Sequence, residues 1–282
     1  MTGQESVRYL ASAANPHLKE LARLKERRGR RKAGLYLVEG LREAQRALDG
    51  GVIATELLLA PDIVSAPSET LAGLLEAARV AGAEEVHLSP AAFAQLSLRD
   101  KPDGVVLVAR SRQLSPASAG LHADSLVLVV DGLEKPGNLG ALMRTADAVG
   151  VDALLLCGSG SEAGGTDLEN PNVIRASMGS VFAMTTATGS RAEVAAALAG
   201  AGLRLVAATP HASGSMWDAD LTGGVALLLG TEGAGLPQWW LGRADLHVRI
   251  PMRATAADSL NVSVAGAVLL YEALRQRSAG PQ

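Results

Sequence analysis

The sequence predicts an α/β protein of two domains, and three observations lead to this prediction. Short apolar runs at 126–130, 153–157 and 225–229 alternate with segments of helical periodicity, which is typical of a largely parallel sheet covered on both faces. A stretch of Pro, Ser and Gly residues precedes this pattern. The 282 residues leave room for a smaller domain before that stretch. We therefore expect domains at 1–112 and 124–282, joined by a linker at 113–123.

Helices and strands are mixed in the expected N-terminal domain. Leu18, Leu21 and Leu24 recur at the spacing of one helix face, and a basic run follows them. Ser89 and Pro90 are typical of a helix start, because serine caps the first turn and proline fits its first position. Strands are expected at 35–40, 56–60, 86–88 and 105–109, and helices at 41–48 and 71–80.

The expected C-terminal domain alternates strands with helices. Strands are expected at 126–131, 153–157, 203–207, 225–229 and 246–250, and helices at 138–149, 191–198 and 262–275. The helix at 138–149 has one apolar face, predicted to pack on the sheet, formed by Leu139, Leu142, Met143, Ala146 and Val149. Arg144 points away from that face among small residues. It is either an ordinary surface arginine or a residue with open space for a ligand.

Composition argues for a globular protein without a membrane span or a metal site. Hydrophobic residues make up 48% of the chain and charged residues 20%. No apolar run approaches the ~20 residues of a membrane span, and the N-terminus lacks the apolar core of a signal peptide. Cys157 lies in an apolar strand and predicts a buried structural thiol, while the five histidines show no metal-ligand spacing. We therefore expect a cytoplasmic protein that holds no metal.

The distribution of charge is more informative than the net charge of −3. Basic residues crowd one short stretch, where Glu20 and Glu26 oppose them. Such a block is either an electrostatic footprint for phosphate groups or a solvated helix face. The candidate phosphate-binding residues are Arg23, Lys25, Arg27, Arg28, Arg30, Arg31 and Lys32.

Two predicted strand ends and one helix start suggest a ligand site at the edge of the sheet. The glycine-rich loop at 230–236 follows one apolar strand, Pro251 stops another, and the turn at 259–261 opens the last helix. Glycine allows positive φ and a close approach of the backbone to a ligand. Two other motifs fail: the glycines at 158–164 lack the spacing of a dinucleotide fingerprint, and no Gly-x-Ser-x-Gly elbow occurs.

Three ordered segments resemble the motifs of the SpoU/TrmH family of the SPOUT superfamily, whose members are S-adenosylmethionine-dependent RNA ribose 2′-O-methyltransferases. These segments are PGNLG followed by RTA within 136–146, GTEGAGL at 230–236, and IPM at 250–252 with SLNVS at 259–263. The resemblance covers 126–277. The N-terminal part more loosely resembles the L30e-like RNA-binding domain of many members, including its Glu39-Gly40 segment. Two features depart from the family pattern: Lys135 replaces the usual Asn or Asp, and the spacer between Ile250 and Ser259 is slightly long.

This resemblance implies a trefoil-knotted C-terminal domain, a homodimer, S-adenosylmethionine as cofactor and RNA as substrate. It favours ribosomal over transfer RNA, and 23S rRNA in particular, because the two-domain layout resembles that of rRNA-modifying members. The basic block at 23–32 would bind the RNA. The residues implied to hold the cofactor are Thr209, Gly230, Glu232, Leu236, Ile250, Met252 and Leu260. The residues implied to be catalytic are Arg144, Glu232, Ser259 and Asn261, with Asn138 supporting Arg144.

The chemistry leaves the roles of two of these residues open. Methyl transfer needs the 2′-hydroxyl in line with the methyl–sulfonium bond, so most of the gain is positional. Arginine is a poor base because its pKa lies above about 12, which favours Arg144 as an anchor for a phosphate or a developing alkoxide. Glu232 would orient Arg144, accept a proton, or interact with a helix dipole.

Three alternative functions accompany this interpretation. The first is a tRNA 2′-O-methyltransferase, and the second is a catalytically inactive RNA-binding SPOUT protein. The third is an α/β enzyme that binds a small molecule or a nucleotide and is unrelated to RNA.

Overall fold

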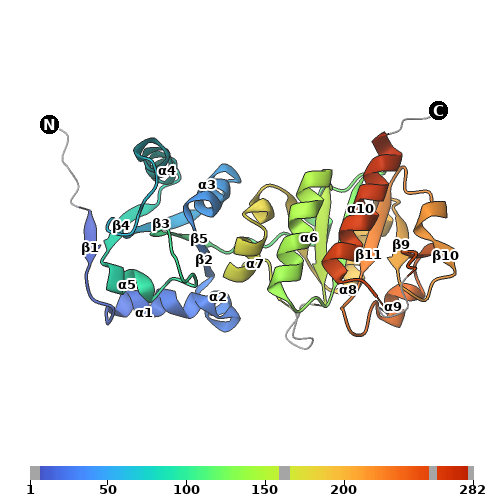
Figure 1. Cartoon of the computed structure of the whole chain (residues 1–282), viewed down its shortest axis with the longest axis horizontal. Helices are drawn as coiled ribbons and strands as arrows, with labels where there is room; N and C mark the ends of the chain where they lie inside the picture. Colours follow the sequence, from blue (N-terminus) through green and yellow to red (C-terminus); the bar gives the residue numbers. More distant parts are fainter. Residues whose placement is uncertain (1–6, 159–165, 254–258, 279–282) are drawn as a thin grey trace. The chain divides into compact units, whose positions relative to one another are not determined.

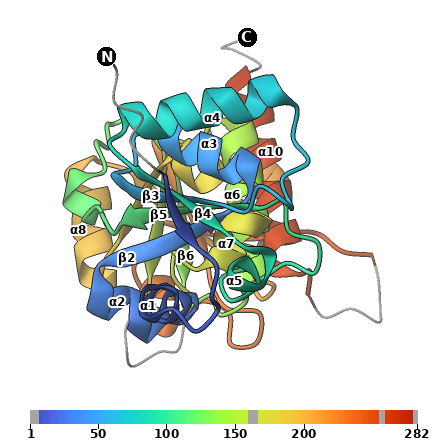
Figure 2. The same cartoon turned by 90° about the vertical axis from the view of Figure 1, so that its left-hand side faces the viewer.

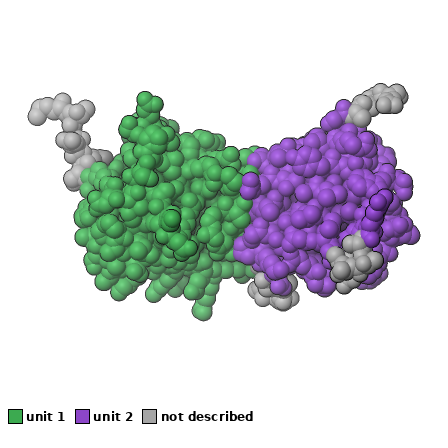
Figure 3. Space-filling model, viewed as in Figure 1, with its two compact units in different colours: residues 1–112, 168–183 green, residues 113–167, 184–282 purple. Residues whose placement is uncertain are grey.

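The computed structural model describes residues 7–158, 166–253 and 259–278 (Figure 1; Figure 2 is the perpendicular view). The chain divides into two compact units, distinguished by colour in Figure 3. The first comprises Met1–Arg112 with Leu168–Ala183, and the second comprises Gln113–Asp167 with Met184–Gln282. The glycine-rich loop expected after Cys157 lies outside the described residues from position 159 to 165, as does part of the spacer before Ser259.

This division differs from the expected domains in two respects, although it also falls after Arg112. Leu168–Ala183 belongs to the first unit, where α7 (Pro171–Ala176) contacts β2 (Leu35–Glu39). The stretch 113–123 is packed in the second unit and is not a free linker, since Pro116 and Ala119 are buried. Proline and serine here form the short 3₁₀ helix η2 (Pro116–Ser118). Composition alone does not separate such a turn from a linker.

The first unit is a five-stranded mixed sheet with helices on both faces. Its strand order is β1-β4-β3-β5-β2, in which β5 runs antiparallel to both of its neighbours. In Figures 1 and 2, α3 and α4 cover one face, and α1, α2 and α5 cover the other. The further elements are β1 (Arg8–Leu10), β3 (Ala54–Leu59), β4 (Glu84–Leu88), β5 (Val105–Arg110), α1 (Pro16–Ala22), η1 (Arg23–Lys25), α2 (Arg27–Ala33), α3 (Leu41–Asp49), α4 (Ser68–Val80), α5 (Pro90–Ala94) and η3 (Ser180–Phe182).

Two details of the sequence analysis are confirmed in this unit. Leu18, Leu21 and Leu24 are buried together in its core. The hydroxyl of Ser89 accepts a hydrogen bond of 3.1 Å from the N–H of Ala92 and so caps α5, as the Ser-Pro pair predicts.

The second unit is a seven-stranded sheet in which every pairing is parallel, as the alternating pattern predicts. Its order is β10-β12-β9-β11-β6-β7-β8. The strands are β6 (Leu126–Asp131), β7 (Ala153–Cys157), β8 (Thr185–Thr188), β9 (Arg204–Ala208), β10 (Gly214–Ser215), β11 (Val225–Leu229) and β12 (Leu246–Arg249). The helices are α6 (Pro136–Val149), α8 (Arg191–Gly200), η4 (Met216–Asp218), α9 (Gln238–Leu241) and α10 (Val262–Ser278). The knot implied by the resemblance stays a prediction.

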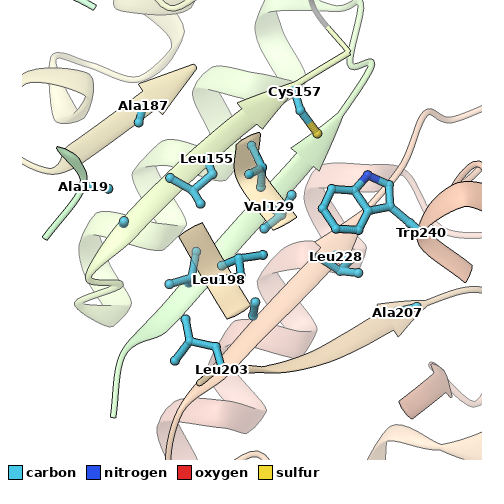
Figure 4. Close-up of a cluster of buried hydrophobic side chains, with 14 of the residues drawn as sticks. Ala119, Val129, Leu155, Cys157, Ala187, Leu198, Leu203, Ala207, Leu228 and Trp240 are labelled. Atoms are coloured by element: carbon cyan, nitrogen blue, oxygen red, sulfur yellow. The ribbon is translucent and has the colours of Figure 1, made fainter. Parts of the chain in front are cut away.

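Strands β6, β7 and β11 are buried along their whole length, which explains why they are almost continuously apolar. The five apolar residues of α6 that were predicted to face the sheet are buried, and Arg144 is exposed. Helix α10 packs beside α6, as Figure 1 also shows. The core of the opposite face is drawn in Figure 4 and includes Val129, Leu155, Leu198, Leu228 and Trp240.

The contact between α6 and α10 depends on Gly266. A Cβ at this position would lie 2.3 Å from a methyl of Leu142 and 2.9 Å from a methyl of Leu229. We expect Gly266→Val to lower the free energy of unfolding by about 1–3 kcal/mol through overpacking, measured by urea denaturation. The control is Gly200→Ala in α8, where a Cβ meets nothing within 4 Å. Equal stabilities of the two variants would contradict this view of the helix contact.

Candidate functional site

The parallel register brings the expected site segments to one edge of the second sheet. Strand β11 lies between β6 and β9, and β12 lies on the other side of β9. The loops that follow these four strands begin at Gly132, Gly230, Thr209 and Ile250. Because the carboxyl ends of parallel strands meet at one edge, these loops emerge together.

The side chain of Glu232 joins three of the predicted motifs. Its Oε1 accepts hydrogen bonds from the amide nitrogens of Asn138, in the first turn of α6, and Asn261, which precedes α10; the latter bond is 2.7 Å. The Asn261 amide also donates to Oδ1 of Asn138 at 3.3 Å. Oε2 of Glu232 forms an ion pair with Lys135. One carboxylate therefore holds together segments that lie about a hundred residues apart in the sequence.

The loop that carries Glu232 is closed by its own backbone. Thr231 and Gly235 exchange two N–H···O bonds of 3.1 Å, and the Thr231 hydroxyl accepts from Ala234 at 3.0 Å. Gly235 has a φ of +66°, which favours glycine. A Cβ on Gly230 would lie 2.1 Å from the carbonyl oxygen of Gly235. The loop's own closure thus already requires Gly230, apart from any approach of a ligand.

The amide of Asn261 is oriented by the helix that follows it. Its Oδ1 accepts from the N–H of Ser263 at 3.0 Å and from the hydroxyl of Ser263 at 2.6 Å. An asparagine immediately before a helix commonly caps the first turn in this way. The carbonyl oxygen is thereby occupied, and the amide nitrogen is left to donate to Glu232.

Arg144 differs from the expected arrangement. Within the described part of the chain it is exposed and takes part in no hydrogen bond or ion pair, so neither Asn138 nor Glu232 supports it. Arg144 lies six residues after Asn138, which is about 9 Å along the helix and on a different face. Asn138 therefore supports Glu232, and Arg144 projects into solvent.

The residues expected to hold a cofactor differ in how far they are buried. Thr209 and Ile250 are half-buried at strand ends, where the N–H of Thr209 donates to Val248 at 3.0 Å. Met252 and Leu260 are apolar yet 39% and 37% exposed. Leu236 is buried in the core around Trp240, so its side chain serves packing. Ser259 is exposed.

Asp131 is a buried carboxylate near the site whose role its place in the sequence does not indicate. Asp131, 1% exposed at the end of β6, accepts two hydrogen bonds from Arg191, of 2.6 and 3.0 Å, and one of 2.6 Å from the indole of Trp240. It thus ties the start of α8 and helix α9 to the end of β6. The only sequence signal was an acid that ends an apolar strand.

Cys157 lies beside this carboxylate, and Figure 4 shows it at the same end of the core as Trp240. The thiol is free and buried, as predicted. Burial, followed by the charge of Asp131, raises the pKa of this thiol well above its ordinary value, so it stays protonated at neutral pH.

The basic block of the first unit does not form a single surface. Arg23, Arg28, Arg31 and Lys32 are exposed and Arg27 is half-buried. Arg30 differs from the expected phosphate-binding role: it is 2% exposed and donates to the carbonyls of Leu24 and Lys25 at 3.1 and 3.0 Å.

Lys25 is also turned inward. Its ammonium donates to the carbonyl oxygen of Ser97 at 3.0 Å. Burial lowers the pKa of Lys25, although the carboxylate of Glu39 opposes that shift. The ammonium of Lys25 therefore stabilises its own fold in place of binding a phosphate.

The structure adds Arg110 to the exposed basic residues. Arg110 ends β5 and pairs with Leu35, directly after the last turn of α2. The N–H of Ser111 donates to the carbonyl of Gly34 at 2.8 Å, which holds the two segments together. Arg110 itself is exposed. The 78 residues that separate it from Lys32 hid this proximity in the sequence.

The described residues offer neither a metal-binding cluster nor a membrane-spanning helix. No group of three or more His, Cys, Asp or Glu residues there could hold a metal ion. None of the helices described is both long enough and apolar enough to cross a membrane.

Comparison with known proteins identifies the class to which this arrangement belongs. The model of the SpoU rRNA Methylase family matches residues 125–271, and that of the MRM3-like substrate binding domain matches residues 15–107. The chain therefore belongs to the SpoU rRNA methylase family, as the motif resemblance predicts.

Individual relatives match over nearly the whole chain. The 23S rRNA (uridine(2479)-2′-O)-methyltransferase of Streptomyces viridochromogenes is 32% identical over 92% of this chain and 89% of its own length. The 23S rRNA (guanosine(2553)-2′-O)-methyltransferase RlmP of Bacillus subtilis is 28% identical, covering 94% and 98%.

Solved structures are also similar to this chain. A structure described as an RNA 2′-O ribose methyltransferase is 43% identical with a TM-score of 0.79, and covers 95% of this chain and 98% of its own. The SpoU methyltransferase AviRb from S. viridochromogenes, in complex with the cofactor AdoMet, is 30% identical with a TM-score of 0.84, covering 95% and 100%.

The Asp131 contacts should contribute strongly to stability. We expect Asp131→Ala to lower the free energy of unfolding by about 2–3 kcal/mol, because it leaves the Trp240 indole unpaired. The cost falls below that of a fully buried ion pair, since the Arg191 side chain is 40% exposed. Urea denaturation followed by tryptophan fluorescence measures it.

The control for this variant is His122→Ala. It breaks the exposed His122–Asp152 pair of the same unit, whose side chains are 61% and 40% exposed. Such a pair contributes little. If both variants unfolded like the wild type, Asp131 would not anchor the two helices.

Proposed function

We propose that the protein transfers a methyl group from S-adenosylmethionine to a ribose 2′-hydroxyl of RNA, with 23S rRNA as the substrate. The observation that carries this proposal is the convergence of Asn138, Glu232 and Asn261 at the edge of a parallel sheet. Membership of the SpoU rRNA methylase family supports the reaction class. The names of the 23S rRNA-methylating relatives support 23S rRNA over tRNA.

The loops at the sheet edge fit an adenosyl group. The strand ends at Thr209, Gly230 and Ile250 bring main-chain groups to one edge of the sheet, and Met252 and Leu260 are partly exposed apolar residues of the segments that follow. Ligand sites of this kind combine apolar walls with a few fixed polar groups. S-adenosylmethionine supplies a methyl group already activated on a sulfonium.

The chain's own residues would then act by position and charge. Glu232 keeps the loop at 230–236 in place through Asn138 and Asn261, so these three residues organise the site. Exposed Arg144 is suited to bind an RNA phosphate or the oxygen that becomes negative as the hydroxyl attacks. Ser259, also exposed, is placed to contact the ribose or the cofactor carboxylate.

The exposed residues of the basic block, together with Arg110, would bind the RNA backbone. They are Arg23, Arg28, Arg31, Lys32 and Arg110. Arginine and lysine contacts to phosphates supply most of the salt-dependent affinity for nucleic acid. The match to a substrate-binding domain over residues 15–107 supports this assignment.

The protein would act in the cytoplasm as a homodimer. Val264 and Tyr271 of α10 are 48% and 54% exposed, and their spacing of seven residues puts them on one helix face. A second copy of this chain would cover that face.

The reaction is tested by incubating the protein with labelled S-adenosylmethionine and rRNA and mapping the product by primer extension. We expect label on a 23S ribose, and Arg144→Ala to lower kcat at least about a hundredfold, as for loss of a transition-state donor. Cofactor affinity and melting temperature should stay unchanged because the side chain is exposed. Arg79→Ala serves as the control for a lost surface arginine, since its side chain is 73% exposed. A fully active Arg144→Ala variant would remove that residue from the mechanism.

The basic surface is tested by the salt dependence of RNA binding. Replacing Arg31 and Lys32 together by Ala should reduce the slope of log K against log salt by about one to two, and Arg110→Ala by about one. The control is Arg79→Ala in α4, on the opposite face of the first sheet (Figure 2). Unchanged slopes would make this block a solvated face.

Oligomeric state is tested by sedimentation. The wild type should sediment at twice the mass of the chain, and Tyr271→Glu should shift it toward the monomer because the charge would be buried unpaired. Tyr9→Glu replaces an equally exposed tyrosine in the first unit, 58% exposed, and should leave the dimer intact. A monomeric wild type would refute the dimer.

A further inference from the structure

Lys135 forms a contact within the site that the proposed reaction does not use. Its ammonium pairs with Oε2 of Glu232, the oxygen that neither asparagine occupies. Lys135 is the residue immediately before α6, and its side chain makes no capping hydrogen bond there.

We propose that Lys135 is a positioning residue, which fixes the side chain of Glu232 and through it the loop at 230–236. The inference rests on the proposed function. It assigns Lys135 to the protein's own carboxylate and not to an RNA phosphate.

The occupancy of Glu232 supports this role. Asn138 and Asn261 both donate to Oε1, so hydrogen bonds at that oxygen alone leave the carboxylate able to rotate about its terminal torsion. The pair with Lys135 at Oε2 removes that freedom. The carboxylate is then held from the start of α6, from its own loop and from the start of α10.

Electrostatics at the start of α6 point the same way. The first turn carries no acidic residue, and Lys135 adds a positive charge where the helix dipole is also positive. Glu232 supplies the opposing charge from another segment. Because the side chain of Glu232 is 26% exposed and that of Lys135 is 70% exposed, the pair should contribute little to folding and act mainly on side-chain geometry.

The test is a double-mutant cycle of Lys135→Met and Glu232→Gln. The Glu232→Gln side chain keeps an oxygen for the two asparagines and loses the ion pair. We expect Lys135→Met to weaken S-adenosylmethionine binding, measured by calorimetry, and to lower kcat by about two- to fivefold, the range of a largely exposed ion pair. In a protein that already carries Glu232→Gln, Lys135→Met should have no further effect on cofactor binding.

Further readouts separate positioning from other roles. Lys135→Arg should keep most of the wild-type kcat. Lys135→Met should not change the melting temperature or the KM for RNA. The slope of log K for RNA against log salt should stay constant. The control is Arg79→Met, which breaks the exposed pair with Glu76 and should leave all these quantities unchanged.

Two outcomes would overturn the inference. Additive effects of the two substitutions would mean that Lys135 and Glu232 act independently. A salt slope reduced by about one, with a raised KM for RNA, would mean that Lys135 binds a phosphate. Failure of the proposed function is a different result: the wild type would transfer no methyl group to 23S rRNA, while calorimetry would still decide the cycle.

Discussion

The parallel pairing of β6, β11, β9 and β12 is the constraint on which the site depends. In this register Leu229 lies opposite Val130, so the segment leading to α6 and the loop at 230–236 leave the sheet side by side. The segment after β6 and the loop after β11 are each anchored by a fully buried strand. The side chain of Glu232 can therefore reach the first turn of α6 without a long insertion, and a hydrogen-bonded site forms from segments far apart in the chain.

Two carboxylates at this edge of the sheet differ in burial, and the buried one has a structural role. Asp131 is 1% exposed, and all the groups that bind it belong to the core and the helices around it. Glu232 lies further out, with a side chain 26% exposed, and its partners stand at the solvent side. The first carboxylate holds the sheet edge together, and the second organises the surface where a substrate would arrive.

The basic block at 23–32 shows that a run of basic residues in the sequence does not by itself form one charged surface. The guanidinium of Arg30 closes the turn between η1 and α2 by binding two backbone carbonyls. Lys25 binds a third, that of Ser97. Buried backbone acceptors need donors, and the folded chain takes them from this block. Fewer exposed basic side chains therefore remain to bind phosphate than the sequence suggests. Arg110, at the end of β5, adds one to them.

The sequence by itself determined the alternation of strands and helices in the second unit, the buried face of α6, the Ser89 cap and the family. These properties depend on local periodicity and on the order of motifs, which each segment carries in its own residues. The sequence did not predict the short elements β1, β8, α7 and α9, because they have no periodicity. Only the tertiary structure decided that Asn138 supports Glu232 and not Arg144, that Arg30 is buried, and that Lys135 pairs with Glu232. Such contacts join segments whose distance in space depends on strand order, which no local pattern specifies.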